Sequence, residues 1–221
     1  MTPANGEKQS DRRMAFRVRH FFNDELSIEE GILSEDLMAR VAKGDRYAFE
    51  ALVKRHQKKV LNLVYRLIGD KARAEDLAQE VFIRVWKAAG RYKPTAQFNT
   101  WIYRITTNLC LNELKSSRHR EFFFPLSRTK EEDPEEDYLE RHINWTQSPE
   151  ELLIAAETNR QVSAALRSLP AQQRLAVVLK RYDGLSYDEI ARILGCSVSA
   201  VDSLLVRAKR NLRKKLGPYK K

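Results

Sequence analysis

The chain has 221 residues, of which 43% are apolar and 32% charged, so it can bury one or two ordinary cores and is neither disordered nor fibrous overall. Its 40 Lys and Arg residues outnumber its 30 Asp and Glu residues, and the net charge of +10 favours a polyanionic partner, nucleic acid ahead of membranes, over an acidic substrate. No apolar stretch is long enough to span a bilayer, and residues 1–24 lack the apolar run of a signal peptide, so we expect a cytoplasmic protein without membrane insertion.

Four helices are predicted in the first part of the chain. Residues 1–33, which include a basic and aromatic run at 12–22, form an N-terminal extension of unknown role. Beyond them, apolar residues recur at three-and-four spacing, which is typical of helices that bury one face. The expected helices lie within residues 37–43, 45–68, 70–85 and 98–120.

A linker and a second helical domain follow. Helical periodicity fails after residue 120, and seven acidic residues in ten between Glu131 and Glu140 should repel one another, so 121–148 is predicted to be an acidic, flexible linker. Ser148 and Pro149 then carry a helix-start signature. The second domain, 149–217, should hold four helices at 149–166, 170–182, 187–194 and 198–216, before a basic tail at 218–221.

Glycines separate these helical segments, and no segment has a comparable strand periodicity, so the predicted fold class is all-α with two small domains. A residue in the left-handed conformation typically ends a helix, and glycine adopts it most readily. Six glycines fall between the expected helices, at positions 44, 69, 90, 184, 195 and 217.

The last two helices have the spacing of a helix-turn-helix motif. Ser186 and Glu189 form a capping box, Gly195 breaks the short helix, and Ser197 can cap the next one. The inner faces would come from Ile190, Ala191, Leu194, Val198, Val201 and Leu205. The other face of the last helix is polar and basic, and we expect it to enter a DNA major groove, although a basic helix end can also be merely solvated. Its candidate DNA-binding residues are Ser197, Ser199, Asp202, Ser203, Arg207, Lys209 and Arg210.

A polar face is also predicted on the helix that contains residues 76–86. Asp76, Gln79, Glu80 and Arg84 lie outside its apolar stripe at helical spacing. Such a face can bind a protein, or it can be an ordinary solvated surface with an ion pair between Glu80 and Arg84.

The segment that follows, 88–104, combines aromatic and cationic residues, a mixture that suits single-stranded DNA because exposed bases stack on rings while cations hold the backbone. Phe98 and Trp101 have core spacing, so Tyr92 and Tyr103 are the preferred stacking candidates. Further polar residues could follow a phosphate backbone. The candidates in this segment and along the helix are Tyr92, Lys93, Thr95, Gln97, Asn99, Tyr103, Arg104, Asn108, Asn112, Lys115 and Arg118.

No enzymatic, metal or cofactor site can be nominated. Cys110 and Cys196 are far apart within helical patterns, and the four histidines lack metal-ligand spacing. His56 falls on an apolar stripe, where a packed, hydrogen-bonded ring is expected rather than a general base. A glycine-rich phosphate loop and a nucleophile elbow are both missing from the sequence. We therefore predict a binding protein rather than an enzyme.

Two blocks of the sequence carry a family resemblance. Asp76–Trp86 followed by Phe98–Asn108 resembles region 2 of the extracytoplasmic-function sigma factors of the sigma-70 family. Leu169–Ala191 with Val198–Lys209 resembles region 4 of the same family. The resemblance covers residues 34–216 apart from the linker, and it implies region 2 at 34–120 and region 4 at 149–217.

The resemblance implies a non-enzymatic RNA polymerase subunit that directs the core enzyme to promoters and helps to melt them. Asp76, Gln79, Glu80 and Arg84 would then dock on the clamp of the largest polymerase subunit. The 88–97 loop would capture a flipped base of the minus-ten element, with Thr95, Gln97 and Asn99 as candidates, and the helix from Ser197 would read the minus-thirty-five element. The linker would thread toward the active-site channel, and an anti-sigma factor is the implied inhibitor.

One residue departs from the family pattern. Asp202 stands where many members carry a basic residue, and a carboxylate there could accept a hydrogen bond from a cytosine amino group. Two other functions remain open: a stand-alone helix-turn-helix regulator whose first domain senses a ligand or dimerises, and a sigma-like adaptor that sequesters an anti-sigma factor.

Overall fold

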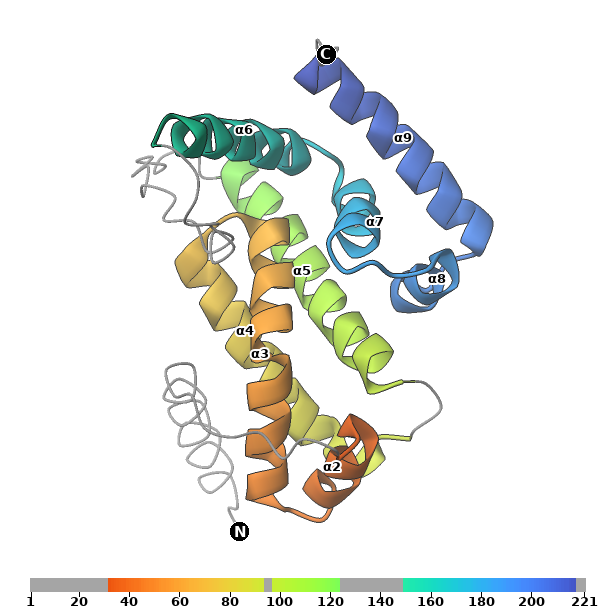
Figure 1. Cartoon of the computed structure of the whole chain (residues 1–221). Coiled ribbons are helices and arrows are strands. Elements are labelled where there is room, and N and C mark those ends of the chain that lie inside the picture. The colour runs from red at the N-terminus through yellow and green to blue at the C-terminus, as the bar shows by residue number, and fades with distance from the viewer. Residues whose placement is uncertain (1–31, 94–96, 124–148, 218–221) are drawn as a thin grey trace. The chain divides into compact units, whose positions relative to one another are not determined.

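A computed structural model describes residues 32–93, 97–123 and 149–217, with side chains except at 117–123 and 149–156. These ranges contain eight α-helices, one short 3-10 turn and no strand, as the all-α prediction requires (Figure 1). Within them, no helix has both the length and the apolar character needed to cross a bilayer. The N-terminal extension up to residue 31, most of the acidic linker, and Ser148 lie outside the described residues.

The chain divides into two compact units, in agreement with the expectation of two helical domains. The first unit comprises Met1–Tyr65 with Asp70–Leu109, and the second comprises Arg66–Gly69 with Cys110–Lys221. The division therefore falls within two long helices, near the end of Arg46–Ile68 and near the middle of Phe98–Phe123, and not at the predicted linker.

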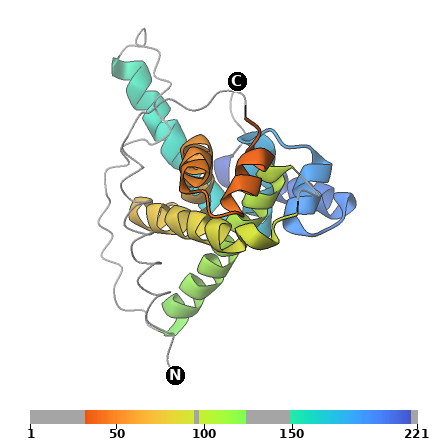
Figure 2. The ribbon, with the colours of Figure 1, turned by 90° about the horizontal axis from the view of Figure 1, so that it is seen from below.

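The first unit is built on α2, α3, α4 and α5, which Figure 2 shows from below. Their bounds are Ser34–Val41, Arg46–Ile68, Lys71–Ala88 and Phe98–Phe123, and the 3-10 turn η1 spans Ala89–Arg91. The predicted helices are all present. However, α5 continues to residue 123, into the range predicted for the linker, because helix propagation gains a hydrogen bond per residue even beyond the apolar stripe.

The core of the first unit comes from the predicted apolar stripes. Leu52 and Leu63 of α3, Phe82 of α4, and Phe98 and Ile102 of α5 are at most 1% exposed. Burial of side chains this large contributes about 1.5–3 kcal/mol each. Hydrophobic packing of the predicted faces therefore holds these helices together.

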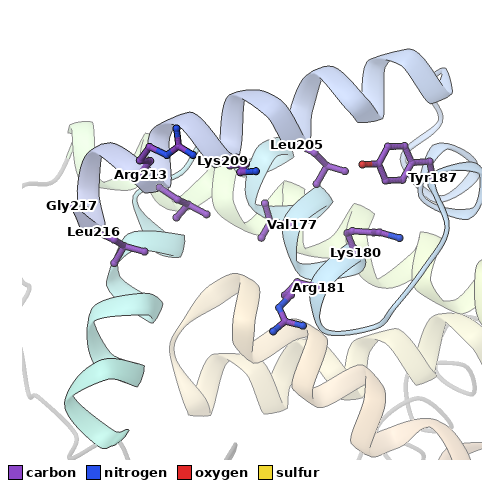
Figure 3. Close-up of a pocket in the computed structure, with 10 residues that line it drawn as sticks. Val177, Lys180, Arg181, Tyr187, Leu205, Lys209, Arg213, Leu216 and Gly217 are labelled. Atoms are coloured by element: carbon purple, nitrogen blue, oxygen red, sulfur yellow. The ribbon is translucent and has the colours of Figure 1, made fainter. Parts of the chain in front are cut away.

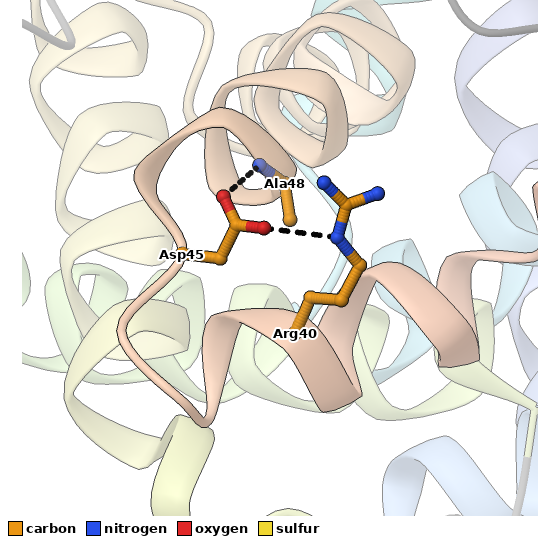
Figure 4. A network of polar contacts seen from close by, with 3 residues as sticks. All are labelled: Arg40, Asp45 and Ala48. Carbon is orange, nitrogen blue, oxygen red and sulfur yellow. Dashed lines mark hydrogen bonds and ion pairs between the residues drawn. The ribbon is translucent and has the colours of Figure 1, made fainter.

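A tight turn joins α2 to α3. Gly44 has φ +88°, a conformation that side-chain-bearing residues rarely adopt. Asp45 follows, and its Oδ1 atom accepts from the Ala48 amide at 3.0 Å while Oδ2 accepts from Arg40 Nε at 2.9 Å (Figure 4). These hydrogen bonds, the one from Ala48 first, lower the pKa of Asp45. The ionised carboxylate therefore caps α3 and ties it to α2.

The second unit contains α6 (Pro149–Arg167), α7 (Ala171–Arg181), α8 (Tyr187–Leu194) and α9 (Val198–Leu216). α8 and α9 have the predicted bounds, α6 ends one residue later than predicted, and α7 is one residue shorter than predicted at each end. α9 contacts each of the other three helices.

Packing and polar contacts both hold the second unit. Leu166, Leu169 and Ala208 form a buried cluster, with Val162, Val177 and Leu212 packed against it. The buried Arg174 donates to the backbone carbonyls of Arg167 and Leu169, and so satisfies carbonyls at the end of α6. In addition, Asn211 Nδ2 donates to Gln173 Oε1 at 2.9 Å, which links α9 to α7.

One glycine differs from the expectation. Gly44, Gly69, Gly184, Gly195 and Gly217 have positive φ, as predicted for residues that end helices. Gly90 instead lies inside η1 without a positive φ, because the chain continues from α4 into a 3-10 turn there.

Candidate nucleic-acid interface

The turn between α8 and α9 is fixed by caps on both helices. Ser186 Oγ accepts from the Glu189 amide at 3.2 Å, and Glu189 Oε2 accepts from the Ser186 amide at 2.8 Å. Hydrogen bonds from Ser186 lower the pKa of Glu189, so the box favours the ionised carboxylate. Gly195 ends α8 in the left-handed conformation, and Ser197 Oγ accepts from the Ala200 amide at 3.2 Å. The predicted helix-turn-helix signature is therefore confirmed.

The inner face of this helix pair is mostly the predicted one. Ile190, Ala191 and Val201 are buried, and Leu194 and Leu205 are half-buried. Val198 is 41% exposed, contrary to the prediction, because it is the first residue of α9 and few neighbours surround a helix end. Ile193, which was not predicted, is 2% exposed and completes the α8 packing face.

The outward face of α9 is polar and basic. Ser203 is half-buried and its carbonyl accepts from Arg207 Nε at 3.2 Å. Val206, an apolar side chain in the middle of this face, is 51% exposed. The other DNA candidates are exposed: Ser197, Ser199, Asp202, Arg207, Lys209 and Arg210.

An apolar groove of about 800 Å³ lies beside α9 (Figure 3). Its apolar lining comes from Val177 of α7 and from leucines of α9. Four cations, Lys180, Arg181, Lys209 and Arg213, also line it. Lys209 therefore borders the groove as well as the polar face to which it was assigned.

The α4 residues predicted to bind protein share the side of the helix that faces away from its buried stripe. Asp76 and Arg84 are exposed, and Gln79 and Glu80 are half-buried. Glu80 Oε1 accepts from Arg84 Nε at 2.8 Å, which is the expected ion pair. The half-buried Ile83, which was not among the predicted residues, lies between them on the same side. The face thus combines charge with one apolar contact point.

Aromatic rings gather where η1 leads into α5. The Tyr92 ring packs edge-on to Trp101 with centroids 4.9 Å apart. Its hydroxyl oxygen is buried and has no hydrogen-bond partner among the described residues. Burial first, and then the Glu35 carboxylate, raise the pKa of Tyr92. The half-buried Tyr92 ring therefore lies within the electrostatic influence of Glu35.

Tyr103 differs from its predicted role. Its side chain is only 7% exposed, so its ring packs in the core and offers no face to a base. Trp101, assigned mainly to the core, is half-buried and more accessible than Tyr103. The physical reason is that the buried face of α5 is wide: it also takes in Thr106 and Thr107, whose hydroxyls bond to carbonyls one turn back.

The remaining candidates at the start of α5 and along it lie on the surface. Lys93 precedes the helix, and Gln97 and Asn99 flank its first residue. Thr95 and the side chain of Arg118 lie outside the described residues. The other members are all exposed and recur at three-and-four spacing: Arg104, Asn108, Asn112 and Lys115. They form one polar side of α5.

His56 is packed and hydrogen-bonded, as predicted. It is 5% exposed, and its Nε2 atom lies 2.9 Å from Ser34 Oγ. Its ring packs against Phe98 with centroids 4.9 Å apart. Desolvation lowers its pKa to about 4, so the ring is neutral near neutral pH.

One contact in this region was not predicted. Glu35, in the first turn of α2, accepts a hydrogen bond from the backbone amide of Phe98 through Oε1 at 2.7 Å. The two residues are 63 positions apart, so no local sequence pattern indicates the contact.

The described thiols and carboxylates do not form a metal centre. Burial raises the pKa of Cys110 to about 12, so this thiol stays protonated. Across the described ranges, no three His, Cys, Asp or Glu side chains come together as metal ligands.

Comparisons with known proteins match both units. Sigma-70 region 2 matches residues 52–120, and sigma-70 region 4 matches residues 159–212. The RNA polymerase sigma-H factor of Pseudomonas aeruginosa is 35% identical over 83% of this chain and 94% of its own length. The ECF RNA polymerase sigma-E factor of Escherichia coli is 35% identical over 86% of this chain and 98% of its own.

Solved structures agree with these sequence matches. The structure of CnrH in complex with the cytosolic domain of CnrY has a TM-score of 0.57 at 25% identity, covering 85% of this chain and 99% of that one. The sigma factor RpoE of Bartonella quintana, in complex with the anti-sigma factor NepR, shares the fold, with a TM-score of 0.58 at 19% identity over 78% and 98% of the two chains. A region 2 match is followed in the sequence by a region 4 match that contains the helix-turn-helix, and the relatives are matched over nearly their whole length. This chain therefore belongs to the extracytoplasmic-function RNA polymerase sigma factors of the sigma-70 family.

Proposed function

We propose that this chain binds core RNA polymerase, directs it to specific promoters, and opens the DNA there by binding rather than by bond chemistry. The main support for this proposal is that one chain contains two helical units, each with a surface suited to a different form of DNA. One has an aromatic and polar surface suited to unpaired bases, and the other has a capped helix-turn-helix with a basic face. No cofactor and no small-molecule substrate are needed, and the site of action is the cytoplasm.

The polar face of α4 is proposed to dock on the clamp of the largest polymerase subunit. Asp76, Gln79, Glu80 and Arg84 supply its charged and hydrogen-bonding groups, and Ile83 adds an apolar contact at their centre. Interfaces gain specificity from charge complementarity and affinity from desolvated apolar contacts. The internal pair of Glu80 and Arg84 is exposed on both sides, so a partner can exchange it at little cost.

The surface around the start of α5 is proposed to bind the minus-ten element. Lys93, Gln97 and Asn99 offer donors and acceptors at one end, and the polar side of α5 beyond Arg104 can follow the backbone of the separated strand. Tyr92 and the half-buried Trp101 bring aromatic surface to the same place. Flipping a base costs a few kcal/mol, which stacking and hydrogen bonding can offset without ATP.

The outward face of α9 is proposed to read the minus-thirty-five element in the major groove. Ser197, Ser199 and Asp202 lie in the first turns, where base edges are met, and Arg207 and Arg210 lie where phosphates are met. Asp202 can accept from a cytosine amino group, and the exposed Val206 can contact a thymine methyl group.

An anti-sigma factor is the proposed inhibitor. CnrH was solved in complex with the cytosolic domain of CnrY, and the sigma factor RpoE of Bartonella quintana was solved in complex with the anti-sigma factor NepR. In this chain, the groove between α7 and α9 is apolar inside and cationic at Lys180, Arg181, Lys209 and Arg213. It would accept an apolar segment of the inhibitor flanked by acidic residues.

Binding to core polymerase separates this proposal from its alternatives. A stand-alone regulator must take all its affinity from its own DNA contacts, so it should bind specific duplex tightly when alone. We expect purified protein to retain core polymerase in a pull-down and to bind duplex weakly without it. Strong, specific duplex binding without core binding would support the regulator. Binding of an anti-sigma factor without any initiation would support a sequestering adaptor.

A further inference from the structure

The start of α5 is capped by a residue from a distant helix. Phe98 is the first residue of this 26-residue helix, and its amide donates to the Glu35 carboxylate of α2 at 2.7 Å. The positive end of the helix dipole favours an anion at this position, and hydrogen bonds to an ionised acceptor are stronger than neutral ones. Glu35 lies in the first turn of α2, whose own N-cap, Leu33, makes no side-chain cap bond. The Glu35 carboxylate therefore caps the N-terminus of α5.

The helix end that carries Glu35 is itself fixed to α3. Ser34 Oγ lies 2.9 Å from His56 Nε2, and Arg55 Nη1 donates to the Ile32 carbonyl at 2.5 Å. His56 in turn packs on the Phe98 ring. The cap bond is therefore held at both ends: α3 fixes the position of Glu35, and the His56 ring fixes the position of Phe98.

The residues proposed to meet the flipped base lie on either side of this bond. Gln97 and Asn99 are exposed and flank Phe98, so the Phe98 backbone sets the direction in which both project. Before α5, next to η1, the Tyr92 ring packs near Phe98, with centroids 6.2 Å apart, and its pKa is raised by burial and then by Glu35. Glu35 thus lies next to both described edges of the proposed base site, through its bond to the Phe98 amide and its effect on Tyr92.

We propose that Glu35 is a positioning residue for minus-ten recognition. It holds the first turn of α5 in the orientation that presents Gln97 and Asn99 to the flipped base, and this assignment rests on the proposed function. Loss of a helix cap typically lowers the population of the capped state roughly three- to tenfold. Replacing Glu35 should therefore weaken recognition of the minus-ten base without touching either the α4 face or α9.

The test compares E35A with two matched variants. D36A removes the neighbouring exposed carboxylate of α2 and controls for charge. D45A removes another carboxylate that caps a helix, α3, and controls for a lost cap in the same unit. E35Q keeps an oxygen acceptor but not the charge, and it should restore part of the effect. Each variant is assembled with core polymerase.

The probe is a single-stranded oligonucleotide that carries the non-template minus-ten sequence of a promoter found by run-off transcription, paired with a copy altered at the flipped base. We expect E35A to lose roughly fivefold of the discrimination between the two oligonucleotides, with unchanged affinity for core polymerase. D36A and D45A should discriminate as the wild type does. Hydrogen exchange of the backbone amides at 97–100 should be accelerated in E35A to a similar degree, which reports on the cap without DNA.

Two results would overturn the assignment of Glu35: wild-type discrimination by E35A, or an equal loss of discrimination in D45A. A wild-type holoenzyme that ignores the altered base would instead refute the proposed minus-ten function itself, and the assignment with it.

Discussion

Acidification should destabilise the first unit through a single buried imidazole. His56 is 5% exposed, and desolvation lowers its pKa from 6.5 to about 4 in the folded chain. The unfolded chain therefore takes up the proton first as the pH falls. For a base whose pKa is lowered by folding, stability is intact above the unfolded pKa and is lost progressively between 6.5 and about 4.

The size of the effect follows from the two pKa values. Their difference corresponds to about 3 kcal/mol once the pH is below both, and to about 2 kcal/mol near pH 5. A domain of this size is stable by about 5–15 kcal/mol, so the loss is a large part of the total. The Ser34 contact and the Phe98 ring should loosen together, because both touch the same imidazole.

The assay is urea unfolding of the full chain near pH 7.5 and near pH 5, for the wild type and for H56Q. Glutamine can still bond to Ser34 but does not titrate, so the difference between the two pH dependences isolates His56 from every other titrating group. We expect the wild type to lose about 2 kcal/mol more than H56Q on acidification. Equal losses in the two proteins, or an imidazole pKa near 6.5 in an NMR titration, would refute this reasoning.

Three further predictions concern the two units. E80K should abolish retention on core polymerase in a pull-down. Its thermal unfolding should change little, because the exposed pair with Arg84 contributes at most about 1 kcal/mol to stability. Unchanged retention would show that α4 is not part of the docking surface. S186A should lower the free energy of unfolding by about 1 kcal/mol, measured by urea titration, since it removes one half of the capping box with Glu189; an unaltered titration would mean that the box is not formed in solution. R210A should weaken promoter binding by the holoenzyme. The magnitude of the slope of log affinity against log salt concentration should fall by about 1, as expected for one lost phosphate contact. An unaltered slope would show that Arg210 does not contact the DNA.

Local signals in the sequence were sufficient for the second unit. α8 and α9 have the predicted bounds because Ser186 and Ser197 each accept from an amide three residues later, and the Gly195 amide donates to the carbonyl four residues earlier. His56 was predicted to be packed because its neighbours at helical spacing are apolar. Such short-range rules depend little on the rest of the fold.

The features that differ from the sequence-based predictions depend on long-range packing. Tyr103 was expected to face a base, but α5 is covered on a wide face, and its polar ring lies inside. The bond between Glu35 and Phe98 joins residues 63 positions apart, which no periodicity can indicate. The groove beside α9 also requires α7 and α9 to be placed together before its lining can be known. These features depend on which helices become neighbours.

Transcription itself tests the central claim most directly. Core polymerase, this protein, and a mixture of the two would each be incubated with a library of genomic fragments, and the run-off transcripts compared. We predict discrete, promoter-specific transcripts from the mixture alone. The reactions are run in low salt, under reducing conditions and with no inhibitor present. If the transcripts are then the same with and without this protein, the proposed function is wrong.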